Sequence, residues 1–348
     1  MKKVTVSAPG KLLLFGEHAV VYGRPCIVTA VDQRLSVTVE LIDKSIFQLN
    51  APDVNIINYQ KPIDQLGKGN IPKGAKFVEI AVKNFLLSLR GGSKATDVAI
   101  YIKSRFPRSA FGGPRNDGLG VKVTTKSEFS SQFGFGSSSA STVCVIKALS
   151  ELFGKKLSNK QIFDLSYKTI LDVQGKGSGF DVAAATFGGT LYFVTGGKAI
   201  KPLNIPSLPL IVGYSGIKAD TVTIVNQVLE KAKKYPFIAD STYTAIGYLV
   251  IQARKAIIES DLKTSGELMN LNQGYLEVLG VSSNKLSNMI YASRDAGAYG
   301  AKLSGAGIGD CMIALAPFSK IKAVKNAITK AGGQVINIKA SVEGVKIE

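Results

Sequence analysis

The sequence predicts an α+β protein of two domains, and two observations lead to this fold class. Alternating residues rich in β-branched side chains, such as 27–41, predict strands, whereas residues 143–153 place apolar side chains at helical spacing. Beyond the proline-rich residues 201–209, the expected order of helix, strand, helix and strand is typical of a ferredoxin-like layer. We therefore place the junction in this segment and expect domains over residues 1–203 and 204–348.

The first domain is expected to open with a strand at residues 3–7, a turn at residues 8–10 and an apolar run at residues 12–15. Residues 43–75 have little pattern and many Pro, Gly, Asn and Lys residues, so we interpret them as an insertion with short strands at the surface or over a binding face. The other expected elements are strands at 27–41, 98–103, 121–125 and 190–194, helices at 76–89 and 160–173, and a loop at 104–120.

The second domain is expected to begin with a strand and to continue with amphipathic helices that are mostly structural. A polar turn at residues 215–221 precedes the first of these helices. The expected strands cover residues 210–214, 311–315 and 335–338, and the expected helices cover residues 222–233, 241–260, 261–279, 285–298 and 320–331.

Composition indicates a folded protein, since 45% of its 348 residues are hydrophobic and 20% are charged. Lys and Arg number 43 against 25 Asp and Glu, a net charge of 43 − 25 = +18. A basic balance favours nucleic acid, an anionic membrane face or a phosphorylated ligand as partner. The lysines are scattered, without a basic tail or aromatic residues between them, so we interpret them as a solvated surface and expect no nucleic-acid partner.

The three cysteines, Cys26, Cys144 and Cys311, lie far apart within apolar runs. His18 is the only histidine, and no CxxC pair is present, so the sequence predicts neither a zinc site nor a disulfide framework. Buried free thiols and the lack of a signal peptide or long apolar segment favour a cytoplasmic protein without a membrane anchor.

Residues 132–154 combine a glycine-spaced turn with the start of a helix. Gly134, Phe135 and Gly136 precede Ser137, Ser138 and Ser139, and the apolar helix follows directly. Glycines allow close approach to the backbone, and the free N–H groups of a first helical turn favour an anion such as phosphate. The alternative interpretation is a flexible turn with an ordinary serine cap.

Two further polar clusters stand out. Lys11 follows a Pro-Gly pair, and Glu17 and His18 stand between two apolar runs, an unusual pair that a simple turn with His18 packed on Tyr22 would also explain. A second glycine-rich turn, residues 175–179, delivers Asp181 to a helix start of small residues. Asp181 is either a helix cap or a carboxylate held in place for chemistry.

A third glycine-rich turn, residues 304–310, precedes the apolar strand expected at residues 311–315. Taken alone it is weak support for a binding site, because a tight hairpin turn has the same composition.

Together, the runs PGKLLLFGEHAVVYG, FGFGSSSAS and SGAGIGDC resemble the three motifs of the GHMP small-molecule kinases. The resemblance extends from Val4 to Leu315 and includes the run SGFD that ends at Asp181. It implies an N-terminal domain like ribosomal protein S5 domain 2, which binds ATP, and a ferredoxin-like C-terminal domain, with both substrates in the cleft between them. The implied activity is transfer of a phosphoryl group from ATP to an alcohol.

The resemblance also implies roles for individual residues. The loop from Gly134 to Ser139 would wrap the ATP phosphates, and Ser138 would bind Mg²⁺. Asp181 would take or orient the proton of the acceptor hydroxyl, with Lys11 beside it. The implied supporting contacts are Gly305, Ala306 and Gly307 at the phosphates, and Glu17, His18, Ser178 and Gly179 at the acceptor.

The acceptor is expected to be a small molecule, and two candidates stay open. The run GEHAVVYG is most similar to GHMP kinases that act on mevalonate, whereas GKGSGFDVAAA and SGAGIGDC are closer to those that act on phosphomevalonate. Mevalonate-directed members carry a metal-binding Glu eleven residues before the catalytic Asp, where this chain has Ile170. Asp172 is the nearest carboxylate and is the expected replacement.

We favour mevalonate, because the block containing Lys11 and His18 is the one that contacts the acceptor. Some relatives keep the fold but act as regulators or sugar-binding proteins, so a non-catalytic binding protein is the third hypothesis for the function. A pure binding protein has no need of Lys11, Ser138 and Asp181 together. The sequence leaves the oligomeric state open between a monomer and a homodimer.

Overall fold

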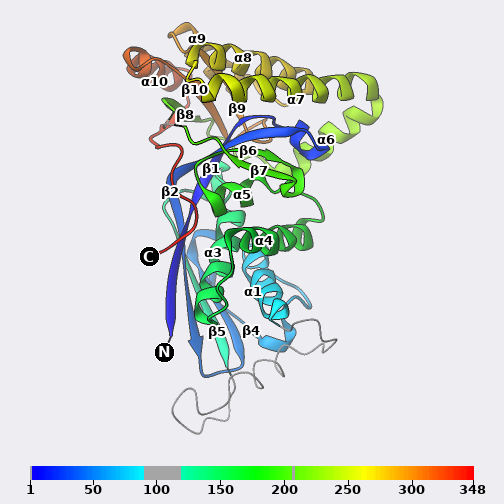
Figure 1. Ribbon diagram of the computed structural model, residues 1–348, viewed down its shortest axis with the longest axis vertical. Helices are drawn as coiled ribbons and strands as arrows, with labels where there is room; N and C mark the ends of the chain where they lie inside the picture. Colours follow the sequence, from blue (N-terminus) through cyan, green and yellow to red (C-terminus); the bar gives the residue numbers. More distant parts are fainter. Residues whose placement is uncertain (1, 90–118, 206–207) are drawn as a thin grey trace.

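The computed structural model describes residues 2–89, 119–205 and 208–348. The chain forms an elongated molecule in which a tall sheet domain stands below a layer of helices (Figure 1). The strand predicted at residues 98–103 and the loop predicted at residues 104–120 lie wholly or almost wholly outside the described residues.

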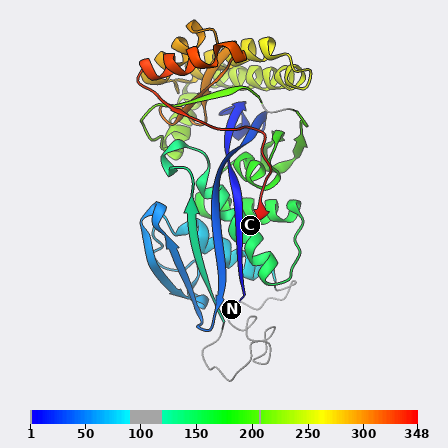
Figure 2. The same ribbon diagram turned by 90° about the vertical axis from the view of Figure 1, so that its left-hand side faces the viewer.

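The N-terminal domain is a mixed sheet covered by helices α1 (Lys76–Ser88), α3 (Ser137–Leu152), α4 (Asn159–Gln174) and α5 (Phe180–Phe187). Strands run in the order β12-β1-β2-β5-β3-β4, with β6 on β2 and β7 on β6, and the long strands extend through the lower domain (Figure 2). The strands are β1 (Lys3–Phe15), β2 (Pro25–Ile42), β3 (Ile46–Ala51), β4 (Ile56–Pro62), β5 (Gly120–Ser127), β6 (Thr190–Val194), β7 (Ala199–Pro202) and β12 (Lys346–Ile347).

The turn predicted at residues 8–10 is wrong, because the chain continues through these residues as the single strand β1. The pairing of β1 with β2 shifts its register between Pro9 and Gly10. A register shift tolerates proline, which lacks the N–H that a regular ladder requires. Beyond it, the Lys11 N–H donates to the carbonyl oxygen of Phe135 at 3.0 Å, so the expected turn is instead a join between β1 and the glycine loop.

The insertion at residues 43–75 contains the predicted short strands, β3 and β4, which extend the large sheet at its edge. Glu79 of α1 is fully buried and holds this hairpin in place. Its carboxylate accepts hydrogen bonds from the Tyr59 hydroxyl at 2.7 Å, Lys61 Nζ at 2.8 Å and the Gly67 N–H at 2.7 Å. The hairpin therefore packs at the surface, away from the cavity described below.

α3 is the central helix of this domain, as its apolar spacing predicts. It packs against β1, β2, α1 and α4, and Val143, Ile146 and Leu149 are fully buried. Burial of one such side chain contributes roughly 1.5–3 kcal/mol, so this packing fixes where the helix begins.

The C-terminal domain is a four-stranded antiparallel sheet in the order β11-β8-β10-β9 with helices packed on it. This arrangement confirms the α+β prediction, although β9 and β7 were not predicted. The strands are β8 (Leu210–Tyr214), β9 (Gly300–Ser304), β10 (Cys311–Leu315) and β11 (Gln334–Ile336), and the helices are α6 (Thr221–Lys234), α7 (Pro236–Ile258), α8 (Leu262–Leu279), α9 (Asn284–Asp295) and α10 (Ile321–Lys330).

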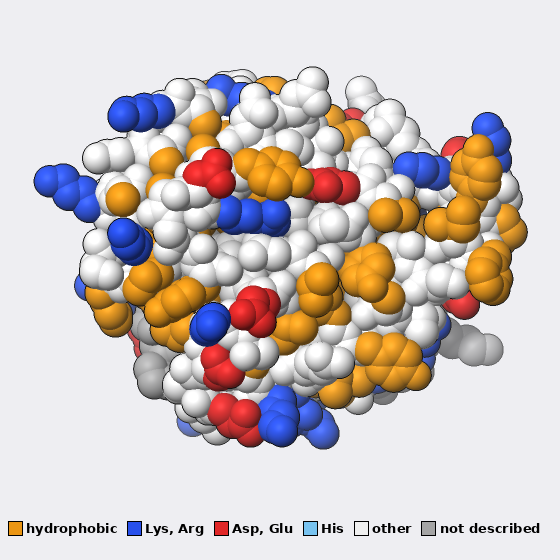
Figure 3. Space-filling model, turned by 90° about the horizontal axis from the view of Figure 1, so that it is seen from above, with side chains coloured by type: hydrophobic (Ala, Val, Ile, Leu, Met, Phe, Trp, Pro, Cys, Tyr) orange, Lys and Arg blue, Asp and Glu red, His pale blue; other side chains and the backbone are white. Residues whose placement is uncertain are grey.

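Seen from above, the helical layer is a mixed surface in which basic, acidic and apolar side chains alternate (Figure 3). Phe237 and Tyr248 of α7 are among its exposed apolar residues. None of the helices within the described ranges has the length and apolarity needed to cross a membrane.

The last residues of the chain return to the N-terminal domain. β12 pairs with β1, Ala340 bridges to Val31, and Arg34 Nη2 donates to the Gly344 carbonyl oxygen at 2.8 Å. The chain therefore crosses between the domains again beyond β11, a crossing that the expected domain of residues 204–348 did not include.

Candidate active site

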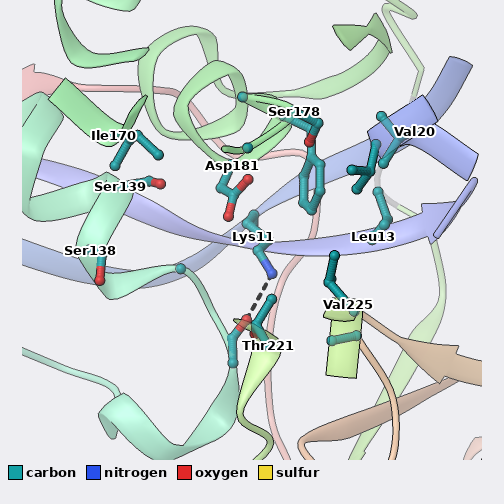
Figure 4. Close-up of a pocket in the computed structure, with 18 of the residues that line it drawn as sticks. Lys11, Leu13, Val20, Ser138, Ser139, Ile170, Ser178, Asp181, Thr221 and Val225 are labelled. Carbon is teal, nitrogen blue, oxygen red and sulfur yellow. Dashed lines mark hydrogen bonds between the residues drawn. The ribbon is translucent and has the colours of Figure 1, made fainter. Parts of the chain in front are cut away.

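A cavity of about 270 Å³ opens between the two domains, where α3 and α5 begin beside β1 (Figure 4). It brings together residues from all three glycine-rich motifs. The expected site residues that line it are Lys11, Glu17, His18, Gly134, Gly136, Ser137, Ser138, Ser139, Ser178, Gly179, Asp181, Gly305 and Ala306.

Three expected site residues lie outside the lining. Phe135 is buried and packs against Phe129 and Phe133, so only its backbone takes part. Gly307 lies against Val281, because a Cβ built on it would lie 2.2 Å from the Val281 carbonyl oxygen. The third is Asp172, which is described with the metal ligands below.

α3 begins without a side-chain cap among the described residues. Its N-cap is Gly136 at φ 83°, preceded by Gly134 at φ 72°, two left-handed conformations that glycine adopts without strain. Ser139 N–H bonds to the Gly136 carbonyl oxygen at 3.1 Å, while the N–H groups before it belong to the unpaired first turn. The cavity thus meets the positive end of a sixteen-residue helix, an arrangement suited to phosphate.

The side chains of Lys11 and Asp181 both lie beside Gly136. A Cβ built on Gly136 would lie 3.3 Å from Lys11 Cε and 3.6 Å from Asp181 Cβ. Lys11 Nζ donates to the Gly134 carbonyl oxygen at 2.8 Å and lies 5.5 Å from the centre of the Phe180 ring (Figure 4). The two groups that the sequence paired are therefore close together beside the glycine loop.

The alternative role of Asp181 as a helix cap is wrong, because the N-cap of α5 is Gly179 at φ 92°. A Cβ on Gly179 would lie 2.8 Å from the Tyr167 ring, and the Tyr167 hydroxyl donates to the Gly177 carbonyl oxygen at 2.8 Å. This packing fixes the glycine turn, and Asp181 in the first helical turn points toward Lys11 (Figure 4).

Glu17 and His18 form a sharp turn between β1 and η1 (Ala19–Tyr22). His18 lines the cavity and its Nε2 donates to the Ala306 carbonyl oxygen at 2.9 Å, while burial holds the pKa of the imidazole below its usual value. The Glu17 carboxylate is fully buried and paired with Lys302 of β9. Both residues border the cavity, but the Glu17 carboxylate is used for the contact with Lys302 of the other domain.

The loop at residues 304–310 joins β1 to the glycine loop. Ser304 Oγ bonds to both the N–H and the carbonyl oxygen of Leu13, each at 3.0 Å. Asp310 Oδ1 accepts from the Ala219 N–H at 2.9 Å, and a Cβ on Gly134 would lie 2.4 Å from Asp310 Oδ2. This turn is therefore more than a hairpin, since it contacts two walls of the cavity.

The structure corrects the prediction that Asp172 supplies the carboxylate for the metal. Asp172 lies outside the cavity lining, and its Oδ2 accepts from Asn84 Nδ2 at 2.8 Å and from Lys168. Burial works to raise the pKa of Asp172, but these hydrogen bonds outweigh it and lower the pKa. Asp172 follows Ile170 by two positions, which is little more than half a turn of α4. The helix therefore directs Ile170 into the cavity and Asp172 away from it.

Oxygen donors suited to Mg²⁺ are nevertheless present in the lining. Mg²⁺ is held by one or two carboxylates together with substrate phosphates, and the cavity offers the Asp181 carboxylate and the hydroxyl groups of Ser138 and Ser139. Figure 4 shows the Ser139 hydroxyl on the side of α3 that faces Ile170 and Asp181. Within the described residues, no group of three or more His, Cys, Asp or Glu side chains forms a preformed metal cage.

Sequence reasoning missed several residues of this site. Lys176 and Lys218 line the cavity; Lys176 lies within the glycine-rich turn of residues 175–179, which could have drawn attention to it, whereas Lys218 looks like any of the scattered lysines in the sequence. Lys302 lies in a strand that was not predicted and is fully buried, and nothing in its sequence context distinguishes it.

The fold and the cavity define a two-domain kinase, and comparison with known families agrees. Residues 77–189 match the GHMP kinases N-terminal domain, and residues 253–334 match the GHMP kinases C-terminal domain. The chain belongs to the GHMP kinase family. This membership supports the prediction that the protein is an ATP-dependent kinase.

Relatives within the family extend over the whole chain. Two curated proteins named mevalonate kinase, from Thermococcus sibiricus and Pyrococcus horikoshii, are each 36% identical to it. The alignments cover 99% and 100% of this chain and 98% of each relative. The solved structure of Methanococcus jannaschii mevalonate kinase shares the fold, with a TM-score of 0.76 at 24% identity over 99% of both chains.

Proposed function

We propose that the protein is a mevalonate kinase, which transfers the γ-phosphoryl group of ATP to the 5-hydroxyl of mevalonate. The observation that carries the proposal is the meeting of Lys11 and Asp181 at Gly136, where α3 begins. The full-length similarity to curated mevalonate kinases supports mevalonate as the acceptor.

In this proposal the phosphates of ATP lie against the start of α3. The N–H groups of Ser137 and Ser138 and the helix dipole stabilise their negative charge, and the glycines leave room for close approach. Phosphoryl transfer depends mainly on positioning and charge neutralisation, which the loop at residues 134–139 and Lys11 would supply.

Asp181 is the proposed base for the acceptor hydroxyl. It orients the hydroxyl and takes its proton as the oxygen attacks the γ-phosphorus, and the bond to the ADP oxygen breaks in line. Lys11 also lies beside Gly136, where its cation would stabilise the developing alkoxide. Gly305 and Ala306 would close the site over the phosphates, and His18, Ser178 and Gly179 would contact the acceptor.

Mg²⁺ is the proposed cofactor, held by Ser138 and Asp181 together with the ATP phosphates. When bound, it neutralises phosphate charge. Because Ile170 and not a carboxylate faces this region, the protein supplies fewer charged ligands, and we expect the metal to be held mostly through the nucleotide.

An ADP-release assay tests the acceptor. The purified protein is given ATP and Mg²⁺ with mevalonate, with 5-phosphomevalonate or with neither. We expect ADP release that depends on mevalonate and requires Mg²⁺.

Preferential turnover of 5-phosphomevalonate would move the assignment to phosphomevalonate kinase, the alternative for which Lys176 and Lys218 in the lining offer cations to a second phosphate. Nucleotide binding without turnover of either acceptor would contradict the kinase proposal and leave a binding protein.

A further inference from the structure

The Glu17–His18 turn of the N-terminal domain is held from the C-terminal domain by side chains of α8 and β9. Glu17 pairs with Lys302 of β9, and both side chains are fully buried. Asn272 of α8 accepts the Gly16 N–H through Oδ1 at 3.2 Å. His18 Nε2 donates to the backbone of Ala306, so three neighbouring residues are each tied to the other domain.

The backbone at this point is strained. His18 has φ 58° and ψ −51°, and the Ala19 N–H donates to the Glu17 carbonyl oxygen at 2.6 Å. These values describe a γ-turn of the rare positive-φ type centred on His18. A conformation of this kind persists only where surrounding contacts impose it.

A polar group beside the turn is left unpaired. Asn272 Nδ2, next to the Oδ1 atom that accepts the Gly16 N–H, is buried without a hydrogen-bond partner among the described residues. Leaving such a group unpaired has a free-energy cost, so this arrangement is not the one that stability alone would favour. It is explained if the turn must present His18 to the cavity.

We propose that Lys302 is a positioning residue for the acceptor, which it serves by fixing Glu17 and, through it, the γ-turn that presents His18. Lys302 itself touches no substrate, because its Nζ is occupied by Glu17 and the Leu303 carbonyl oxygen. The proposal rests on the proposed function, since it assumes that the acceptor lies beside His18.

The proposal predicts that loss of Lys302 impairs the use of the acceptor and leaves the binding of the nucleotide unchanged. The start of α3, where the phosphates would lie, is held by β1 and the core and not by Lys302. Loss of Lys302 therefore alters the position of His18 and leaves the phosphate loop in place.

The first test is Lys302→Met, which keeps the length of the side chain and removes its charge. We expect kcat/KM for mevalonate to fall about tenfold to a hundredfold, as misplacement near reacting groups can cause. The dissociation constant of an ATP analogue, measured by calorimetry, should change less than threefold. Equal losses for both ligands would contradict the proposal.

The chain offers a matched control in Lys61→Met. Lys61 pairs with the fully buried Glu79 at 2.8 Å, but this pair joins β4 to α1 and neither residue lines the cavity. Both substitutions leave a buried carboxylate without its lysine, so both lower the melting temperature. Only Lys302→Met should change the kinetics for mevalonate.

The double variant Glu17→Gln/Lys302→Met separates positioning from stability. The neutral amide of Gln avoids the unpaired buried charge that Lys302→Met leaves behind, so this variant should fold even if Lys302→Met does not. We expect its melting temperature to recover while kcat/KM for mevalonate stays low. Recovery of both would show that the pair is only structural and would overturn the proposal.

A spectroscopic readout does not depend on turnover. His18 is the only histidine, so the protein without an affinity tag gives a single set of imidazole signals by NMR. We expect these signals to shift in the double variant and to stay unchanged in Lys61→Met.

If the wild-type protein does not phosphorylate mevalonate, the proposed function fails, while the His18 signals still report whether Lys302 fixes the turn. Unchanged His18 signals in the double variant would contradict the positioning role.

Discussion

α3 and α4 are neighbouring helices of equal length that begin in opposite ways. α4 starts at Ser158, whose side chain accepts the Gln161 N–H while Gln161 Oε1 accepts the Ser158 N–H, a complete capping box. α3 starts at Gly136, and no side chain among the described residues caps it. The first turn of α4, which lies away from the cavity, satisfies its own N–H groups, whereas the first turn of α3, which lies at the cavity, leaves its N–H groups for a ligand.

α5 follows the pattern of α3. Its N-cap is Gly179, and Asp181 stands in its first turn facing the cavity. α6, α8 and α9, in contrast, begin with the side-chain caps Asp220, Asp261 and Ser283. Missing caps alone do not mark the site, because α1 also lacks one, but at α3 and α5 a glycine with positive φ takes the place of the cap.

The largest effect is expected from Asp181→Asn, which leaves both glycine starts intact and removes the proposed base. We predict that kcat falls by a factor of about 10² to 10⁴, the usual contribution of a general base. The affinity for an ATP analogue measured without Mg²⁺ should change little, because the amide does not alter the start of α3.

Steady-state kinetics and calorimetry check this prediction. Asp164→Asn on the exposed side of α4 is the matched control and should have normal activity. An Asp181→Asn variant with normal kcat would remove Asp181 from the chemistry.

Gly136→Ala tests the uncapped start itself. Alanine at φ 83° is strained by about 1–2 kcal/mol, and its Cβ would lie 3.3 Å from Lys11 Cε. We predict roughly tenfold to hundredfold weaker binding of the ATP analogue.

The control is Gly154→Ala, at φ 65° beyond the end of α3, where a Cβ meets nothing within 4 Å. It carries similar backbone strain without touching the cavity, so it should lose stability but bind nucleotide normally. Equal loss of binding in the two variants would attribute the effect to stability alone.

Ser158→Ala breaks the capped start. Loss of an N-cap serine costs about 1 kcal/mol, so the free energy of unfolding in urea should fall by that amount. Activity should stay unchanged, because Ser158 lies away from the cavity. A large loss of activity would mean that the capped and uncapped helices do not have the separate roles described here.

His18 is expected to make the stability of the protein depend on pH without any substitution. Burial lowers the pKa of this imidazole, so the unfolded chain binds the proton more tightly than the folded protein does. Stability is therefore complete above about pH 6.5, the ordinary pKa of histidine, and decreases as the pH falls below it, by at most about 1.4 kcal/mol per pH unit.

The difference in unfolding free energy between wild type and His18→Gln isolates this contribution. It should change between pH 7 and pH 5 in the direction that makes the wild type relatively less stable in acid. If the unfolding free energies of the two proteins changed in parallel with pH, the pKa of His18 would be the same in the folded and unfolded states, which would contradict the prediction.

Much of this comparison could be predicted from the sequence. Glycine spacing predicts the start of α3 and the apolar periodicity of residues 143–153 predicts its buried face, because each of these depends on a few neighbouring residues. The motifs containing Lys11, Ser138 and Asp181 were also recognised, and the cavity brings them together.

The remainder depends on contacts between distant segments. Pro9 and Gly10 predict a turn locally, but pairing with β2 continues the strand through them. Asp172 was chosen by its distance in sequence, whereas the rotation of α4 decides which side chain enters the cavity. Lys302 and Glu17 are 285 residues apart, so only the assembled domains show that they form a pair.

The most direct test is NMR of protein labelled with ¹⁵N-serine, titrated with a non-hydrolysable ATP analogue and Mg²⁺. The account predicts that the amide signals of Ser137 and Ser138, whose N–H groups belong to the unpaired first turn of α3, shift on binding, while that of Ser158 does not, because its N–H is already bonded to Gln161. Saturable nucleotide binding with unshifted signals from Ser137 and Ser138 would contradict it.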